Sequence, residues 1–411
     1  MKYKIILFGA SLRAEKLLEE HNNWDEEFDV IAIMDSNNAK CGTKLWGVEI
    51  VSVEKGLQLK WDYVVICSKK WYEEQWDTLT DKGVDPKRIL PFHSISNIKK
   101  LKRQKETLLD KERTGLVVIF NHKHEKNLPV LRRIYGQRYS EILFLMPFYS
   151  GNDKDVIKVC DSSWNFHGFL AQAYDRIRDM NCEYYLFVGD DLFLNPRFNE
   201  WNSAKLLGLE GKDVYAFMPT ELNKEGNYGW SWFRGRWALQ PFLKSGLNWK
   251  DELPSREEAF RLFEDFLGRE YRHTYEDDIF AGTEATKQDI EKFLEANGNS
   301  RDVLYPLAMA YSDIFALRKR QLKAFSDMLG VFAAMNVFVE IATPTTTILT
   351  TPRKSFSSQD DSAFEFEKCI WDDEGKIYIE KKYNNNISKL IEGFPRDCMF
   401  IHPIKLSRWN E

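Results

Sequence analysis

YYLFVGDDLFLNP, residues 184–196, joins a continuous hydrophobic run to two adjacent carboxylates, Asp190 and Asp191. An unbroken run of this length is typical of a strand in a parallel sheet that is buried on both faces. Carboxylates at the C-terminal end of such a strand are stable when they face water, share a proton or bind a hard cation. We therefore predict a strand that ends at a divalent-metal site. An acidic pair that caps a turn is the alternative.

Further hydrophobic runs on both sides of this stretch alternate with helical patterns. We expect strands at residues 116–120, 142–145, 214–217 and 314–317. The helical patterns cover residues 128–135, 168–180, 256–271 and 319–339. This alternation predicts an α/β domain with a largely parallel sheet, which we assign to residues 115–411.

The order of these features resembles the nucleotide-sugar half of metal-dependent glycosyltransferases of the GT-A fold. The resemblance rests on the segment at 165–177, the strand that follows it and the acidic pair, and it extends over about residues 116–408. In that family an Asp-x-Asp motif binds Mn²⁺ or Mg²⁺ and the diphosphate of the donor. Here Leu192 follows the pair, which leaves open whether Asp190 or Asp191 is the direct metal ligand.

A second part of the resemblance lies in FIHPIK, residues 400–405. A His and a Lys three residues apart after a short apolar strand are similar to the C-terminal element of many GT-A enzymes. The resemblance implies that His402 completes the metal shell and that Lys405 meets the departing diphosphate. Imidazole is a common metal ligand and an ammonium group can neutralise a leaving phosphate, so the chemistry agrees with these roles.

The remaining candidate residues follow from the same resemblance. Glu340, at the end of an expected apolar helix, and Asp313 are candidates for the general base of an inverting enzyme, and a salt bridge is the alternative for each. An aromatic loop at 228–237 would suit stacking on a sugar. The candidate contacts to the donor and its diphosphate are Asn121, His122, Arg138, His167, Gly168, Asp190 and Lys405.

Residues 1–93 form a separate α/β pattern, with hydrophobic runs at 3–8, 30–34, 63–67 and 89–92. This pattern resembles the small Rossmann-like modules at the N-terminus of bacterial sugar-modifying transferases. Only Gly9 matches the dinucleotide fingerprint G-x-G-x-x-G, although Asp35 stands where a ribose-binding acid would. NAD binding, a nucleotide-sugar-related pocket and a structural or oligomerising role all remain open. A charged helical linker is expected at 94–114.

Composition narrows the classes of partner. The net charge is −5, so the chain lacks the basic excess that holds a nucleic-acid backbone, and no nucleic-acid partner is expected. The six cysteines show no CxxC spacing, which indicates a reducing compartment, and no segment reaches the length of a membrane span. We expect a cytoplasmic protein. Peripheral attachment to the inner face of a membrane and homo-oligomerisation stay open.

Together these features predict a metal-dependent glycosyltransferase that moves a sugar from a nucleotide diphosphate to a glycan or lipid-linked acceptor. Bacterial surface-polysaccharide synthesis is the setting that the resemblance implies. An NAD-dependent sugar-nucleotide oxidoreductase centred on residues 1–93 is one alternative. A non-catalytic interaction protein with a degenerate transferase domain is another.

Overall fold

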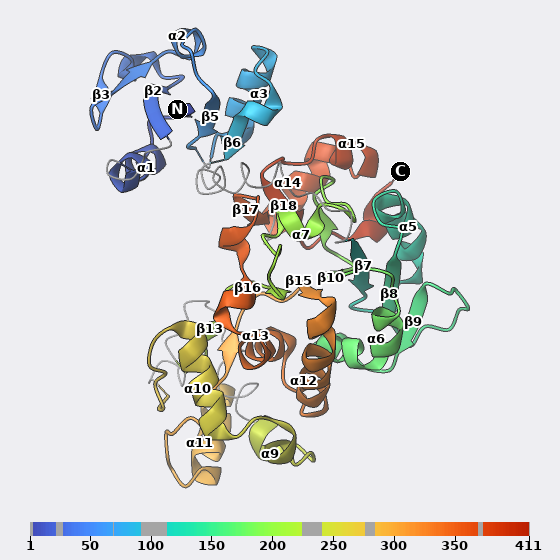
Figure 1. Ribbon diagram of the computed structural model, residues 1–411. Helices are drawn as coiled ribbons and strands as arrows, with labels where there is room; N and C mark the ends of the chain where they lie inside the picture. Colours follow the sequence, from blue (N-terminus) through green and yellow to red (C-terminus); the bar gives the residue numbers. More distant parts are fainter. Residues whose placement is uncertain are drawn as a thin grey trace. The chain divides into compact units, whose positions relative to one another are not determined.

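A computed structural model describes residues 3–21, 28–68, 70–91, 113–223, 241–275, 284–368 and 373–410. The chain forms two compact units, drawn in Figure 1. The first comprises residues 1–109, 363–367 and 394–399, and the second comprises residues 110–362, 368–393 and 400–411. The sequence pattern had assigned the two short later segments to the second domain. The aromatic loop at 228–237 and nearly all of the expected linker at 94–114 lie outside the described residues.

The first unit is built on a six-stranded sheet in the order β3-β4-β2-β1-β5-β6. All neighbouring pairs are parallel except β3 with β4, and the four predicted strands are confirmed. The strands are β1 (Tyr3–Phe8), β2 (Phe28–Met34), β3 (Lys44–Leu45), β4 (Val48–Val51), β5 (Tyr63–Ile66) and β6 (Ile89–Pro91). The helices are α1 (Leu12–His21), α2 (Val53–Leu57) and α3 (Tyr72–Asp81).

The first strand shows why its sequence is hydrophobic without a break. Ile5 and Leu7 pack in one apolar cluster with residues of α1, whereas Ile6 and Phe8 pack in a second cluster with residues of α3. Successive side chains of a strand point to opposite faces of the sheet. Since both faces are covered, every position in β1 from Ile5 onward must be apolar.

The second unit contains a seven-stranded mixed sheet in the order β16-β12-β15-β10-β7-β8-β9. The run from β10 to β9 is parallel, and β15 is antiparallel to both of its neighbours. The α/β class is therefore confirmed, and the predicted strands lie in this sheet. Its strands are β7 (Thr114–Ile119), β8 (Ile142–Pro147), β9 (Val156–Val159), β10 (Tyr184–Gly189), β12 (Val214–Tyr215), β15 (Ile314–Arg318) and β16 (Phe356–Ser357).

Several short strands complete the chain. β11 (Phe193–Leu194) pairs antiparallel with the end of β18 (Cys398–Ile401), and β13 (Thr220–Glu221) pairs with β14 (Ala308–Met309). β17 (Phe366–Lys368) is the neighbour of β18 on its other side.

Ten helices of the second unit are described, and Figure 1 shows α12 beside α13. They are α5 (Leu128–Gly136), α6 (Phe169–Arg178), α7 (Ser203–Leu206), α9 (Trp249–Glu252), α10 (Arg256–Leu267), α11 (Glu284–Ala296), α12 (Leu322–Ala334), α13 (Val339–Thr350), α14 (Asp373–Tyr383) and α15 (Ile387–Glu392).

The single long helix predicted at 319–339 is wrong. The chain forms α12 and then turns into α13 through Asn336, whose φ of 61° lies in the left-handed region that Asn tolerates better than most residues. Glu340 therefore lies in the first turn of α13 and not at the end of the preceding helix.

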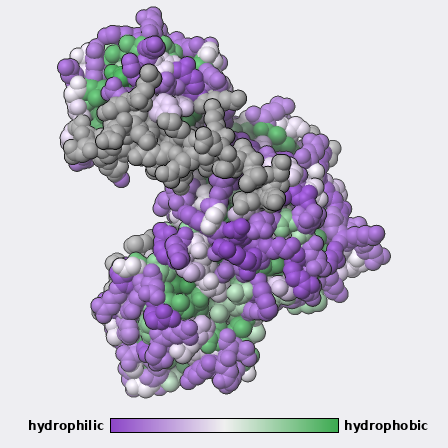
Figure 2. Space-filling model, in the orientation of Figure 1, coloured by the Kyte–Doolittle hydropathy of each residue, from purple (hydrophilic) through white to green (hydrophobic). Residues whose placement is uncertain are grey.

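The surface of the second unit is largely polar on the face drawn in Figure 2, with hydrophobic residues visible around α10 and α13. Among the helices in the described part of the chain, none combines the length and the apolar character that crossing a bilayer requires.

Candidate functional site

The second unit contains a cavity of about 610 Å³ at the C-terminal ends of β7 and β10. Parallel neighbours end at the same sheet edge, so Asn121 after β7 and the acidic pair after β10 come together there. The antiparallel β15 begins at this edge and brings Asp313. The lining residues are Asn121, His122, His124, Asn127, Ser162, Ser163, Trp164, Phe166, Asp190, Asp191, Asp313, Phe338, Val339, Glu340, Ile404, Lys405, Leu406 and Ser407.

Asp190 is almost fully buried and already has two hydrogen-bond donors. The backbone N–H of Asn121 donates to its Oδ1 at 3.0 Å, and Nδ2 of Asn127 donates to its Oδ2 at 3.3 Å. Burial, and then the charge of Asp191, raise the pKa of Asp190 to about 7. These contacts suit a residue that fixes the loop, which leaves its neighbour as the freer carboxylate.

Asp191 faces His402 across the site. Its Oδ1 lies 3.5 Å from Nε2 of His402 and accepts a hydrogen bond from Nδ2 of Asn121 at 3.2 Å. The backbone N–H of Ile404 donates to the carbonyl oxygen of Asp191 at 2.7 Å, which ties the C-terminal segment to the acidic loop. The pairing of Asp191 with His402 agrees with the sequence prediction that these residues share one site.

Gly189 leaves room beside these groups. A Cβ on Gly189 would lie 3.2 Å from Oδ1 of Asp191 and 3.8 Å from Oδ1 of Asp313. The two carboxylates therefore approach the same space, which any larger residue at position 189 would fill. Burial raises the pKa of Asp313, whereas His402 acts against that shift.

The acidic and histidine side chains described above could hold a divalent cation if a bound ligand supplied the rest of its coordination shell. Within the described ranges, no three His, Cys, Asp or Glu side chains are grouped closely enough to hold a metal by themselves. Mg²⁺ is commonly held by one or two carboxylates together with the phosphates of a substrate. Asp191, with Asp313 close by, could supply such carboxylates, and His402 could add an imidazole nitrogen.

The other end of the cavity is aromatic. The rings of Trp164 and Phe338 have centroids 4.5 Å apart, and the rings of His122 and His124 lie 5.6 Å apart at a steep angle. The flat rings provide surfaces against which a base or a sugar could stack. The carboxylates of the same cavity could bind a cation. Lys405, an exposed cation, lines the same cavity.

Glu340 enters the cavity from α13, a different element from the other acids. It is 7% exposed and stands in the first helical turn, where the helix dipole stabilises a carboxylate. The backbone carbonyl of Glu340 accepts a hydrogen bond from Ala310.

Arg138 does not line the cavity. Its guanidinium donates to the carbonyl oxygens of Asn195 at 2.9 Å and Ile134 at 3.1 Å. Arg138 therefore links α5 to the loop that follows the acidic pair, and this structural use accounts for the side chain that we had considered for phosphate.

His167 and Gly168 also lie away from the cavity lining. His167 is fully buried. A Cβ on Gly168 would lie 2.4 Å from Cβ of Ala333. Gly168 thus permits the close approach of the segment before α6 to α12, which is a packing role.

We expect Gly168→Ala to lower stability by about 1–3 kcal/mol, because the added methyl group overlaps Ala333. Adding Ala333→Gly should recover most of this loss, even though glycine itself costs about 1 kcal/mol in a helix. Thermal melting of the two single variants and the double variant measures the coupling. Additive losses in the double variant would contradict this packing role.

In the first unit, the polar groups around the partial glycine fingerprint already form hydrogen bonds with one another. The carboxylate of Asp35 accepts hydrogen bonds from the N–H groups of Ala10 and Asn37, both at 2.8 Å, and from Lys40 at 3.2 Å. The hydroxyl of Ser11 donates to the carbonyl oxygen of Cys67. The acid expected at the ribose position is thus already paired within the unit.

Among the cavity residues that the sequence prediction missed, three shape the site most clearly. Asn127 holds Asp190, and its signal was its place in the polar loop after β7. Trp164 and Phe338 build the aromatic end from segments far apart in the sequence, and no local pattern connects them.

Comparison with known protein families finds a match to the first part of the chain. Residues 1–90 match the family described as C2185-like, N-terminal. No curated protein matches the chain.

Similar solved structures cover about a quarter of the chain. UDP-D-quinovosamine 4-dehydrogenase from Vibrio fischeri is 20% identical over 24% of this chain and 87% of its own, with a TM-score of 0.19. RSP, a Rex-family repressor, is 19% identical over 26% of this chain and 61% of its own, with a TM-score of 0.19. RSP in complex with β-NAD⁺ and operator DNA is 18% identical over 26% and 63%, with a TM-score of 0.18.

Proposed function

We propose that this protein is a metal-dependent glycosyltransferase with a GT-A-like second unit and a Rossmann-like first unit. The observation that supports it best is the distance of 3.5 Å between Nε2 of His402 and Oδ1 of Asp191. Asp191 lines the cavity together with Lys405 and Glu340, whereas His402 contacts Asp191 without being one of the lining residues. These residues come from distant parts of the chain. The site therefore combines a metal-ligand pair, a cation for a leaving diphosphate and a separate carboxylate.

Each group then has one task. A bound Mn²⁺ or Mg²⁺ would be held by Asp191 and His402 and would neutralise the charge of the donor diphosphate. Asn121 orients Asp191, Asp190 fixes the loop, and Lys405 stabilises the leaving nucleotide. The rings of Trp164 and Phe338 flank the base or the sugar. Glu340 receives the proton of the acceptor hydroxyl.

The acceptor in this proposal is a glycan or a lipid-linked sugar, and the reaction takes place in the cytoplasm. Lys405 is an exposed cation that lines the cavity, and in this proposal its ammonium stabilises the charged leaving group. Among the described residues, Lys405 makes no ion pair that would compete with a phosphate. This arrangement favours transfer from a nucleotide diphosphate over a reaction that releases a neutral group.

We expect UDP or GDP to bind by calorimetry, and to bind about ten-fold more tightly when Mn²⁺ is present, with CMP and NAD as comparison nucleotides. Asp191→Asn should remove most of the metal-dependent gain, because the neutral amide carries no charge and offers one ligand oxygen in place of two. Asp175→Asn is the matched control, since Asp175 is 79% exposed and pairs with Arg178 on α6.

Two results would contradict the proposal. In the first, no nucleotide binds more tightly with Mn²⁺, which would favour a non-catalytic protein. In the second, NAD alone binds and the metal has no effect, which would make the first unit the active one.

A further inference from the structure

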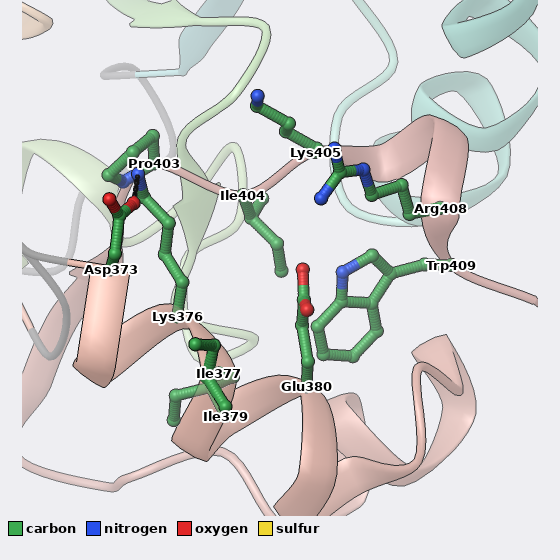
Figure 3. A pocket seen from close by; sticks show the side chains of 10 residues that line it. All are labelled: Asp373, Lys376, Ile377, Ile379, Glu380, Pro403, Ile404, Lys405, Arg408 and Trp409. Atoms are coloured by element: carbon green, nitrogen blue, oxygen red, sulfur yellow. Dashed lines mark hydrogen bonds and ion pairs between the residues drawn. The ribbon is translucent and has the colours of Figure 1, made fainter.

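A second cavity, of about 330 Å³, lies on the second unit between α14 and the C-terminal segment. Ile404 and Lys405 line both this cavity and the larger one. Figure 3 shows the ten residues that line it. They are Asp373, Lys376, Ile377, Ile379, Glu380, Pro403, Ile404, Lys405, Arg408 and Trp409.

Trp409 presents a buried hydrogen-bond donor to this pocket. Its side chain belongs to a residue only 6% exposed, and its indole N–H has no acceptor among the residues that the structure describes. A buried donor without a partner costs free energy, so most such groups in folded proteins are paired. A ligand that brings an oxygen acceptor would remove this cost.

The charged groups of the pocket comprise one ion pair, two side chains without a partner among the described residues, and Lys405. Lys376 and Asp373 form an ion pair at 2.9 Å. The side chains of Arg408 and Glu380 form no hydrogen bond or ion pair with any described residue. In Figure 3 the indole of Trp409 faces the carboxylate of Glu380, the guanidinium of Arg408 lies over the gap between them, and the ammonium of Lys405 points away from both.

We propose that this pocket binds a sugar ring that carries a carboxylate or phosphate group. The guanidinium of Arg408 matches two oxygens of such an acid at once, and the indole N–H of Trp409 donates to another oxygen of the same ligand. Glu380 accepts a hydrogen bond from a ring hydroxyl. The faces of Trp409 and Ile377 cover the apolar side of the ring.

The two residues that line both cavities indicate why such a ligand would bind here. Because Ile404 and Lys405 separate the two cavities, a sugar in the smaller one lies next to the diphosphate end of the donor. We assign the acidic sugar to the acceptor. This assignment rests on the proposed transferase function, whereas binding of the acid does not.

The test is calorimetry on the full chain with glucuronate, glucose 6-phosphate, glucose and glucosamine. We expect at least one of the two acids to bind about ten-fold more tightly than glucose and glucosamine. Binding of glucuronate alone identifies a carboxylate as the anion, and binding of glucose 6-phosphate alone identifies a phosphate. Arg408→Gln and Trp409→Phe should each weaken binding of that acid about ten-fold.

Lys381→Gln is the matched control, because Lys381 is an exposed cation on α14 that does not line the pocket. The pocket proposal is overturned if neither acid binds better than glucose, if glucosamine binds best, or if both pocket variants bind like the wild type. Binding of a nucleotide with Mn²⁺ is measured in the same samples. If the acid binds and no nucleotide does, the pocket stands and the transferase proposal fails.

Discussion

We expect Glu340→Gln to lower the rate of sugar transfer by a factor of about 10²–10⁴, the usual contribution of a general base. Glutamine keeps the shape of the side chain and removes its ability to accept a proton. Nucleotide binding with Mn²⁺ should not change, because the proposed metal ligands Asp191 and His402 lie on other elements. The measurement is release of the nucleoside diphosphate from the donor whose nucleotide binds.

Glu340 is a better candidate base than Asp313 because of where the two acids lie. Asp313 interacts electrostatically with both His402 and Asp191, and its Oδ1 approaches the space beside Gly189. In the proposed mechanism, that carboxylate would act on the cation. Glu340 lies in α13 beside Phe338, at the aromatic part of the cavity. A base that deprotonates an acceptor should not also be a metal ligand, and Glu340 comes from a different element than the acids around His402.

Glu295→Gln provides the control, because Glu295 is exposed on α11 and outside the cavity. A Glu340→Gln variant that retains more than about a tenth of the wild-type rate would rule out the base role. The configuration of the product, followed by proton NMR, gives an independent readout. Action of Glu340 as a base on the acceptor implies inversion at the anomeric carbon.

The sequence was sufficient to predict the strands and the central acidic pair. Strands such as β10 are buried on both faces, so their sequence is continuously apolar and ends abruptly at Asp190. The approach of Asp191 to His402 was also predicted, but through a family resemblance. Hydropathy carries no information about which loops of a sheet edge meet a segment near the C-terminus.

Tertiary packing explains the one helix prediction that failed, and also the structural contacts of two candidate site residues. The break between α12 and α13 comes from Asn336 in a left-handed conformation, and both flanking segments are apolar, so the pattern indicated one helix. Gly168 looked like a ligand-binding glycine, although the space it leaves is taken by Ala333. Arg138 resembled a phosphate contact but bonds to carbonyl groups. In each case the partner is distant in sequence, and the local pattern cannot identify it.

His167 gives the second large prediction, which concerns stability in acid. Its side chain is fully buried, and neither ring nitrogen has a hydrogen-bond partner among the described residues. Burial lowers the pKa of His167 to about 3 in the folded protein, whereas an unfolded histidine titrates near 6.5. Between these two values the unfolded chain binds a proton that the folded chain excludes. This contribution to stability is therefore complete above about pH 6.5 and is lost as the pH falls.

The loss approaches about 1.4 kcal/mol for each pH unit below 6.5, which amounts to roughly 3 kcal/mol at about pH 4.5. We expect His167→Phe to remove this dependence, whatever it does to stability at neutral pH. The measurement is the change in free energy of unfolding between about pH 7.5 and pH 4.5, compared between variant and wild type.

Buried acids such as Asp190 and Asp313 titrate in both proteins, so their contributions cancel in the comparison. His273→Gln is the control, because its imidazole is 55% exposed. If His167→Phe and the wild type lose the same free energy on acidification, His167 is protonated or paired in the folded protein, and its buried neutral state is excluded.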